Sequence, residues 1–128
     1  MKLLLDTHTF VWRLLDDPRL PQSTNDLIDD MSNQIFLSSV SGFEIATKFS
    51  VGKLKLPTDA ANFIRIGIEE NQIVELPLVM RHTVGVANLP LIHRDPFDRL
   101  LVSVALDEDM TLLTDDAEIR KYALKLAW

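Results

Sequence analysis

The chain has 128 residues, of which 47% are hydrophobic, and its 13 basic and 19 acidic side chains give a formal net charge of −6. This length excludes two independent domains, so we expect a single domain over residues 1–128. The acidic balance argues against a protein that holds nucleic acid by overall charge, and the lack of cysteine excludes disulfides and thiolate zinc sites.

The first part of the chain alternates short apolar runs with helical patterns. The continuous apolar run Lys2–Leu5 predicts a strand that is buried on both faces. Ser41 and Glu44 have the spacing of a capping box, which predicts a helix over residues 42–50. The other elements expected here are helices over 9–15, 23–31 and 58–71 and a strand over 35–37.

The second part of the chain continues this alternation. A strand is expected over residues 73–76 and a helix over 79–87. Asp95, Pro96 and Asp98 provide an N-cap, a first-turn proline and an early acid, so a helix begins there and extends to Leu106. A strand over 110–113 and a short helix over 114–122 complete the chain. Strands that alternate with helices predict an α/β fold of three layers, with a central parallel sheet flanked by helices.

Acidic residues that are distant in the sequence fall at one edge of the predicted sheet. Asp6 follows the first strand, Asp115 and Asp116 follow the last, and Glu44 and Asp98 lie in first turns of helices. Ligands of an open parallel sheet bind at this edge. Converging carboxylates repel one another unless they bind a cation, and oxygen ligands favour Mg²⁺ or Mn²⁺. Such ions can activate water for phosphodiester hydrolysis.

Each acid also has a structural explanation. Asp95 fits the role of a helix N-cap, Asp98 could only favour the helix dipole, and Glu44 could complete its capping box. The acids that follow strands could be turn or capping residues. A shared location favours the functional interpretation, because capping does not require it.

Basic, histidine and aromatic residues are less specific. Lys48, four residues after Glu44, either forms a helical ion pair or approaches a substrate phosphate, and Arg99, beside Asp98, is the best phosphate candidate. The other residues considered are interpreted as site neighbours, surface or core: His8, His82 and His93, which lack metal-ligand spacing, and Phe10, Trp12 and Phe43, which fit a core better than base stacking.

Four segments together resemble the bacterial PIN-domain toxins of the VapC type. They are LLLDTHTFVW, SSVSGFEIATKFSVGKLKLP, LPLIHRDPFDRLLVSVA and LLTDD, and their order and spacing cover nearly the whole chain. The resemblance implies a PIN-like α/β fold and Mg²⁺- or Mn²⁺-dependent cleavage of RNA. It also implies a homodimer that is neutralised by a small cognate antitoxin.

The family's four acids correspond to Asp6, Glu44, Asp98 and Asp116, which the resemblance makes catalytic and metal-binding residues. Thr114 would be a supporting hydroxyl. The sequence departs from the family pattern in two places: Phe43 stands where a Trp often precedes the Glu, and Asp115 stands where a small residue is common. The second departure leaves open whether Asp115 also binds metal.

Two other functions remain as alternatives. A haloacid-dehalogenase-like phosphatase needs a second Asp two residues after the first, where this chain has His8. A PIN-like domain that binds RNA or an antitoxin without cleavage would not need all four acids. The sequence has no apolar run of roughly 20 residues and no signal-peptide pattern, so we expect a cytoplasmic protein without a membrane segment.

Overall fold

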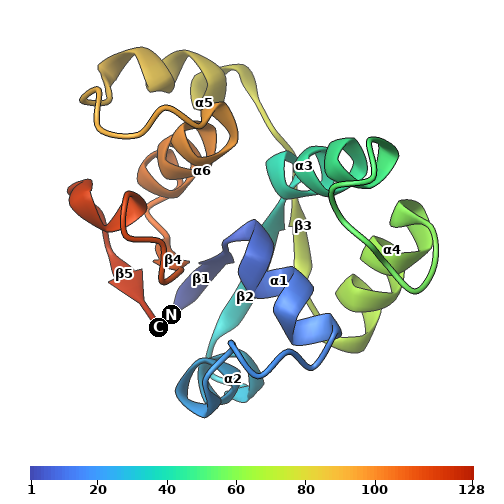
Figure 1. Ribbon diagram of the computed structural model, residues 1–128. Coiled ribbons are helices and arrows are strands. Elements are labelled where there is room, and N and C mark those ends of the chain that lie inside the picture. Colours follow the sequence, from blue (N-terminus) through green and yellow to red (C-terminus); the bar gives the residue numbers. More distant parts are fainter.

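The computed structural model describes residues 1–128 and contains a five-stranded parallel sheet with helices on both faces (Figure 1). The strands lie in the order β3-β2-β1-β4-β5. Their bounds are β1 (Lys2–Leu5), β2 (Gln34–Ser38), β3 (Val74–Leu76), β4 (Thr111–Leu113) and β5 (Leu126–Ala127). The helices are α1 (Thr7–Leu14), α2 (Gln22–Asp29), α3 (Ser39–Ser50), α4 (Ala60–Glu70), α5 (Met80–Gly85) and α6 (Pro96–Asp107), with 3₁₀ turns η1 (Val86–Asn88) and η2 (Ile119–Lys121). The predicted three-layer α/β fold is confirmed.

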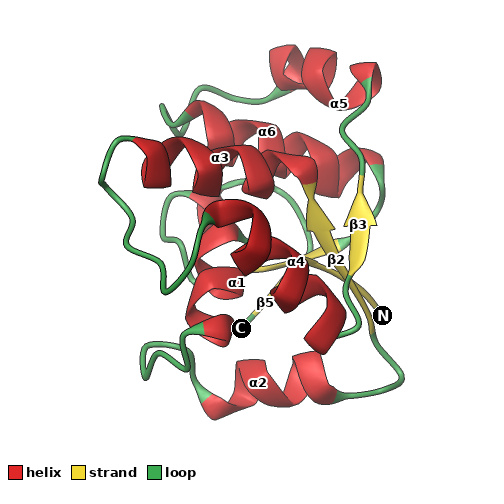
Figure 2. Ribbon diagram, turned by 90° about the vertical axis from the view of Figure 1, so that its right-hand side faces the viewer, coloured by secondary structure: helices red, strands yellow, loops and turns green.

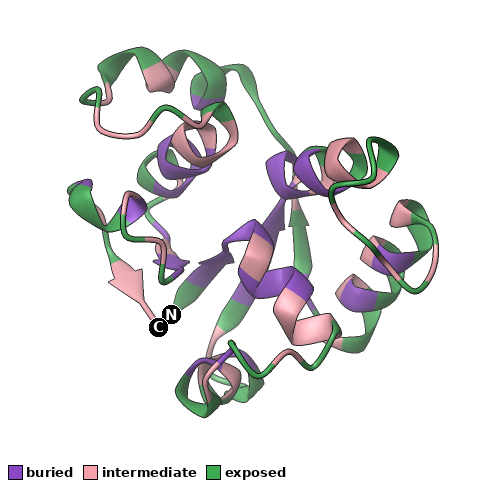
Figure 3. Cartoon of the chain, in the orientation of Figure 1, coloured by how far each residue is buried: buried purple, intermediate pink, exposed green.

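The alternation of side chains along the strands builds a hydrophobic core on each face of the sheet. Leu3 and Leu5 of β1 belong to one core, together with Phe10 of α1 and Phe63 of α4. Leu4 belongs to the other core, to which α6 contributes most of its buried face. All three leucines are completely buried, as the continuous apolar run predicted. Figure 3 shows buried residues on the central strands and on the helices beside them, whereas the edge strands β3 and β5 are exposed or half-buried.

The sheet has a topological switch point beside its central strand. β1 pairs with β2 on one side and with β4 on the other, and Leu5 lies opposite Leu113. Connections that leave in opposite directions open a crevice at the carboxyl ends of such strands. Asp6 and Thr114 are the next residues along these two strands, and the Asp6 N–H donates to the Leu113 carbonyl oxygen at 3.2 Å. The arrowheads of β2 and β3 in Figure 2 point toward the same end of the molecule, where α3 and α6 contact each other.

Helix α3 begins three residues before the predicted start, and the predicted capping box is wrong. Ser38, at the end of β2, is the N-cap, and its hydroxyl accepts the Val40 N–H at 3.1 Å. The Ser41 hydroxyl instead accepts a hydrogen bond from the Thr7 hydroxyl at 2.9 Å. Because the strand leads directly into the helix, Ser38 reaches the free N–H groups first. Glu44 therefore lies beyond the first turn and takes no part in capping.

The carboxyl-terminal segment also differs from its prediction. The expected helix over 114–122 is reduced to the 3₁₀ turn η2, which begins where the Asp116 Oδ1 accepts the N–H groups of Glu118 and Ile119 at 2.8 and 2.9 Å. The strand β5 follows and was not predicted, since two residues carry no periodic signal. None of the helices has the length and apolar character needed to cross a membrane.

Candidate active site

A cleft of about 240 Å³ opens at the carboxyl end of β1, and charged side chains form most of its wall. The four acids that the sequence analysis grouped line it together: Asp6, Glu44, Asp98 and Asp116. They come from the end of β1, from α3, from α6 and from the loop after β4. The structure thus brings together residues separated by as many as 110 positions in the sequence. The other polar lining residues are Thr7, His8, Lys48 and Asp95.

Asp6 is held in place by donors to both of its carboxylate oxygens. Its Oδ1 accepts the Thr7 N–H at 2.7 Å, which makes Asp6 the N-cap of α1, and its Oδ2 accepts the Thr114 hydroxyl at 2.5 Å. Burial raises the pKa of Asp6, while the charge of His8 and these two hydrogen bonds oppose the rise. The Thr114 oxygen also accepts the Asp116 N–H at 3.1 Å. One hydroxyl therefore connects Asp6 to the loop that carries Asp116.

Asp98 lies in the first turn of α6, where negative charge is most crowded. Asp95 caps this helix as predicted, and its Oδ1 accepts the N–H groups of Phe97 and Asp98 at 2.8 and 3.1 Å. Burial, followed by the charges of the surrounding carboxylates, raises the pKa of Asp98 to about 8. Without a cation, this carboxyl group holds a proton at neutral pH. A divalent cation in the cleft would replace that proton.

Glu44 is buried and pairs with Lys48, four residues later on α3. The Lys48 Nζ lies 2.5 Å from the Glu44 Oε2. Burial lowers the pKa of Lys48, but the hydrogen bond and charge of Glu44, together with the charges of other acids in the cleft, raise it overall. The ammonium group therefore places one positive charge among the carboxylates. The sequence left open whether Lys48 forms a helical ion pair or lies near a bound substrate. In the structure Lys48 both pairs with Glu44 and lines the cleft.

His93 contacts the most crowded carboxylate, although its sequence position gave no metal-ligand spacing. Its Nε2 lies 2.8 Å from the Asp98 Oδ2. The Nδ1 accepts the Asp95 N–H at 3.2 Å, so in the neutral ring the proton is on Nε2 and is donated to Asp98. The signal that could have identified His93 is its place five residues before Asp98, in the loop that leads into α6.

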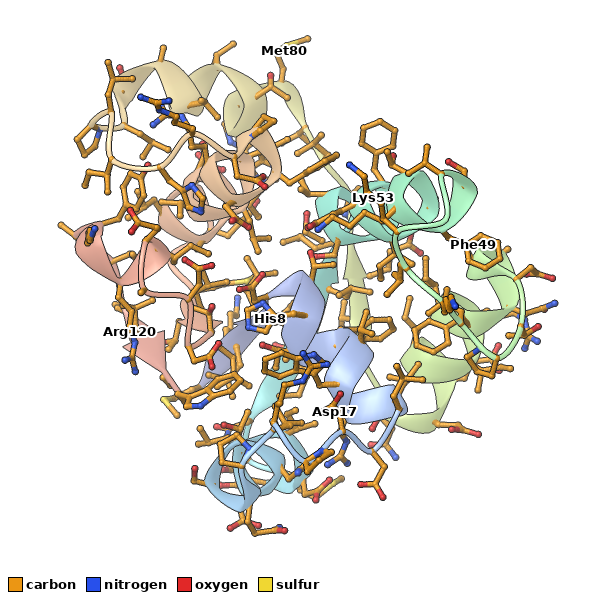
Figure 4. The ribbon with its side chains drawn as sticks, in the orientation of Figure 1. His8, Asp17, Phe49, Lys53, Met80 and Arg120 are labelled. Atoms are coloured by element: carbon orange, nitrogen blue, oxygen red, sulfur yellow. The ribbon has the colours of Figure 1, made fainter.

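His8 lies in the first turn of α1, at the centre of the view in Figure 4. Its Nδ1 is 3.1 Å from the Asp6 Oδ2, and its Nε2 is 2.9 Å from the Asp115 Oδ1. Each ring nitrogen of His8 thus faces a carboxylate oxygen, one from the end of β1 and one from the loop after β4. The sequence identified His8 only as a neighbour of the site, because its partner Asp115 is 107 residues away.

Arg99 does not reach the cleft, and the expectation that it binds phosphate is not supported. Its guanidinium donates to the carbonyl oxygens of Val86 and Pro90 at 3.1 and 2.9 Å and to the Tyr122 hydroxyl at 3.2 Å. These contacts hold the segment between α5 and α6 against the carboxyl-terminal segment. Asp115 also lies outside the cleft lining, so Asp116 is the late acid that faces the other three.

The donor set in the cleft fits a small, hard cation. The ligand atoms of His93, Asp98 and Asp116 lie within 4.8 Å of one another. Because the His93 Nε2 carries a proton, carboxylate oxygens remain as the ligands. Oxygen ligands of this kind suit Mg²⁺ or Mn²⁺.

A second group with metal-like spacing consists of His82, Asp107 and Glu108. Here the His82 Nδ1 accepts the Val79 N–H at 3.1 Å, and Nε2 faces the Glu108 Oε1 at 2.8 Å. The proton on Nε2 is therefore used in a hydrogen bond between α5 and the end of α6. The ring is completely buried, and its polar atoms are satisfied without an ion.

Comparisons with known proteins agree with this arrangement. Residues 3–125 match the family model of the PIN domain, whereas no curated protein matches the sequence. A chain of the Rickettsia felis VapBC2 complex, which is bound to a promoter DNA fragment, superposes with a TM-score of 0.73 and 21% identity, covering 99% of this chain and 98% of that chain. A chain of DNA-bound VapBC from Salmonella typhimurium superposes with a TM-score of 0.71 and 13% identity, covering 99% of this chain and 97% of that chain. A chain of VapBC-1 from nontypeable Haemophilus influenzae superposes with a TM-score of 0.67 and 16% identity, covering 99% of this chain and 97% of that chain.

Proposed function

The chain belongs to the PIN domain family, and we propose that it is a Mg²⁺- or Mn²⁺-dependent endoribonuclease, the toxin of a type II toxin–antitoxin pair. One observation carries this proposal: four acids from distant segments share one cleft, and the pKa of Asp98 among them is raised to about 8. Such crowding opposes folding unless a cation neutralises it, and it is therefore typical of sites built for function.

We assign the cation to Asp6, Glu44, Asp98 and Asp116. A cation held there would polarise the phosphate, stabilise the leaving oxygen and activate water for attack on phosphorus. The chain's own residues prepare this chemistry. Thr114 holds the Asp6 carboxylate through its Oδ2, and His93 holds the Asp98 carboxylate through its Oδ2.

Protons and charges in the cleft also have defined roles in the proposal. Asp98 would bind a cation as the carboxylate and so would give up its carboxyl proton. The Lys48 Nζ pairs with Glu44 in the structure, and with a cation beside Glu44 it would be available to contact a substrate phosphate. Lys48 therefore contributes to substrate binding in this proposal, whereas Arg99 does not.

We also propose a protein partner, an antitoxin, for this chain. Structural neighbours of the chain are components of VapBC complexes, which supports a small cognate antitoxin. We expect its inhibitory segment to place an Arg or Lys among the carboxylates of the cleft, because a guanidinium pairs with carboxylates as a cation does. We also propose that the functional state is a homodimer. Copurification with the product of a neighbouring small gene tests the first point, and the mass in solution tests the second.

The proposed activity is tested by incubating the purified protein with structured RNA and Mn²⁺. Cleavage should appear with Mn²⁺, stop when a chelator is added, and be absent from Asp98→Asn. Asp95→Asn is the matched control, because it removes a charge from the same cleft but retains the helix cap. RNA that stays intact with wild type under all conditions would instead support a PIN domain that only binds RNA or an antitoxin.

A further inference from the structure

Aromatic rings form part of the same cleft. His8 and Trp12 both line it, and their ring centroids lie 4.6 Å apart. The two residues are four positions apart on α1, so they share one face of the helix. Trp128 follows β5, and its ring centroid lies 6.2 Å from each of the other two. We call His8, Trp12 and Trp128 the aromatic wall.

The aromatic wall is open to solvent rather than enclosed in a core. None of its three residues is fully buried. The Arg19 guanidinium lies over the Trp12 ring, 4.6 Å from its centroid, and the Arg19 side chain is 65% exposed. A solvated side chain, which also pairs with Asp17, thus lies over this ring. A planar group can take the place of a guanidinium there, because both interact with the same π face.

The aromatic wall also lies directly beside the proposed metal ligands. The His8 Nδ1 is 3.1 Å from the Asp6 Oδ2, so a group stacked on Trp12 would be a near neighbour of a phosphate bound at the carboxylates. The chain has a formal charge of −6 and offers little overall attraction to a polyanion. Stacking on aromatic rings attracts a nucleotide without requiring positive charge.

We propose that the aromatic wall stacks on a nucleobase adjacent to the scissile phosphate. This inference rests on the proposed ribonuclease function. A base inside a duplex is already stacked on its neighbours, whereas a base in a loop or single strand can turn outward onto Trp12. The aromatic wall would contact the face of a base rather than its hydrogen-bonding edge. Because every base has such a face, binding should depend little on the base sequence.

The experiment uses the fluorescence of the protein itself. Trp12 and Trp128 are the only tryptophans in the chain, so intrinsic indole emission reports on the aromatic wall alone. Asp98→Asn protein in Mg²⁺ is titrated with a short oligoadenylate RNA. An abasic oligomer of equal length and charge is titrated in parallel. We expect the oligoadenylate to quench the emission and the abasic oligomer to leave it nearly unchanged.

Variants of Trp12 make the test specific. Trp12→Leu should weaken oligoadenylate binding about tenfold, whereas Trp12→Phe, which keeps a ring, should stay close to the parent. Phe43→Leu is the matched control, because Phe43 is 66% exposed on α3, pairs with Phe97 and does not line the cleft. Binding by the Trp variants is followed by anisotropy of a labelled oligomer. Circular dichroism melts confirm that each variant is folded.

Failure of this inference differs from failure of the proposed function. Equal quenching by the abasic oligomer, or equal losses of binding in Trp12→Leu and Phe43→Leu, would overturn the base site even if wild type cleaves RNA. Quenching that a peptide from a copurified partner produces but oligoadenylate does not would also overturn it. If wild type never cleaves RNA yet oligoadenylate quenches as expected, the base site stands and the ribonuclease proposal fails.

Discussion

The Nε2 of His93 lies 2.8 Å from the Oδ2 of Asp98, the carboxyl group whose pKa is about 8. This contact fixes the direction in which Asp98 presents its oxygens. His93→Leu removes the donor, and we expect metal affinity and RNA cleavage to fall about 10- to 100-fold, as for other residues that orient metal ligands. His93→Gln retains an N–H donor and should lose less. Wild-type affinity for Mn²⁺ in His93→Leu would show that the contact is not used.

The stability of the metal-free protein should decrease as the pH rises. Between the unfolded pKa of 3.8 and the folded pKa of about 8, Asp98 binds a proton only in the folded state. The stabilisation is complete below the lower value and is lost as pH rises through the upper one, with a slope of at most about 1.4 kcal/mol per pH unit before solvent screening. Urea unfolding in chelator at several pH values measures this slope. Asp98→Asn should reduce it, and an unchanged slope would assign the effect to other groups.

Asp95 should contribute mainly to folding. Its Oδ1 accepts two N–H groups at the start of α6, so Asp95→Ala should lower the free energy of unfolding by about 1 kcal/mol. Asp95→Asn keeps an acceptor and should be nearly as stable as wild type in chelator. Both variants are compared by denaturant unfolding. A loss of cleavage in Asp95→Asn as large as that in Asp98→Asn would place Asp95 among the metal ligands.

In the metal-free protein, the positive charge of Lys48 should stabilise the buried Glu44 carboxylate. Lys48→Met leaves the buried Glu44 carboxylate without its partner, so the melting temperature in chelator should fall. Added Mn²⁺ should recover most of the loss, because it supplies the missing charge. Lys53→Met removes an exposed lysine near the end of the same helix and serves as the control. A loss in Lys48→Met that Mn²⁺ does not recover would mean that Glu44 is not near the cation.

Much of the fold follows from local patterns in the sequence. The apolar run at β1 and the Asp95-Pro96 start of α6 are strong signals, and both elements lie where they were predicted. The convergence of the acids follows from the rule for parallel sheets and needs no side-chain detail. The carboxyl-terminal strand was missed because it depends on pairing with β4, and the true cap of α3 was missed because β2 leads directly into the helix, so that Ser38 caps it before Ser41 can.

The side chains that surround the acids could not be predicted from local sequence patterns. His8 and His93 meet their carboxylates through the tertiary fold, so sequence spacing could not predict these contacts. Phe43 is exposed and Trp12 only half-buried, although both fitted a core by their spacing. Helical spacing states which residues share a face, but not whether a partner covers that face. The single-domain organisation and the cytoplasmic location remain predictions.

The most direct test of the account is calorimetric titration of Mn²⁺ into the metal-free wild type and into Asp98→Asn, followed by thermal melts of both proteins with and without the ion. Wild type should bind Mn²⁺ and gain about 2.7 kcal/mol of stability at a hundredfold excess over the dissociation constant. In chelator above about pH 8, where the wild-type Asp98 carboxyl group is charged, Asp98→Asn should melt at a higher temperature than wild type, because it lacks one crowded charge. It should also bind Mn²⁺ weakly and gain little from it. Equal binding heats and equal melting shifts in the two proteins would contradict the assignment of the cation to these carboxylates.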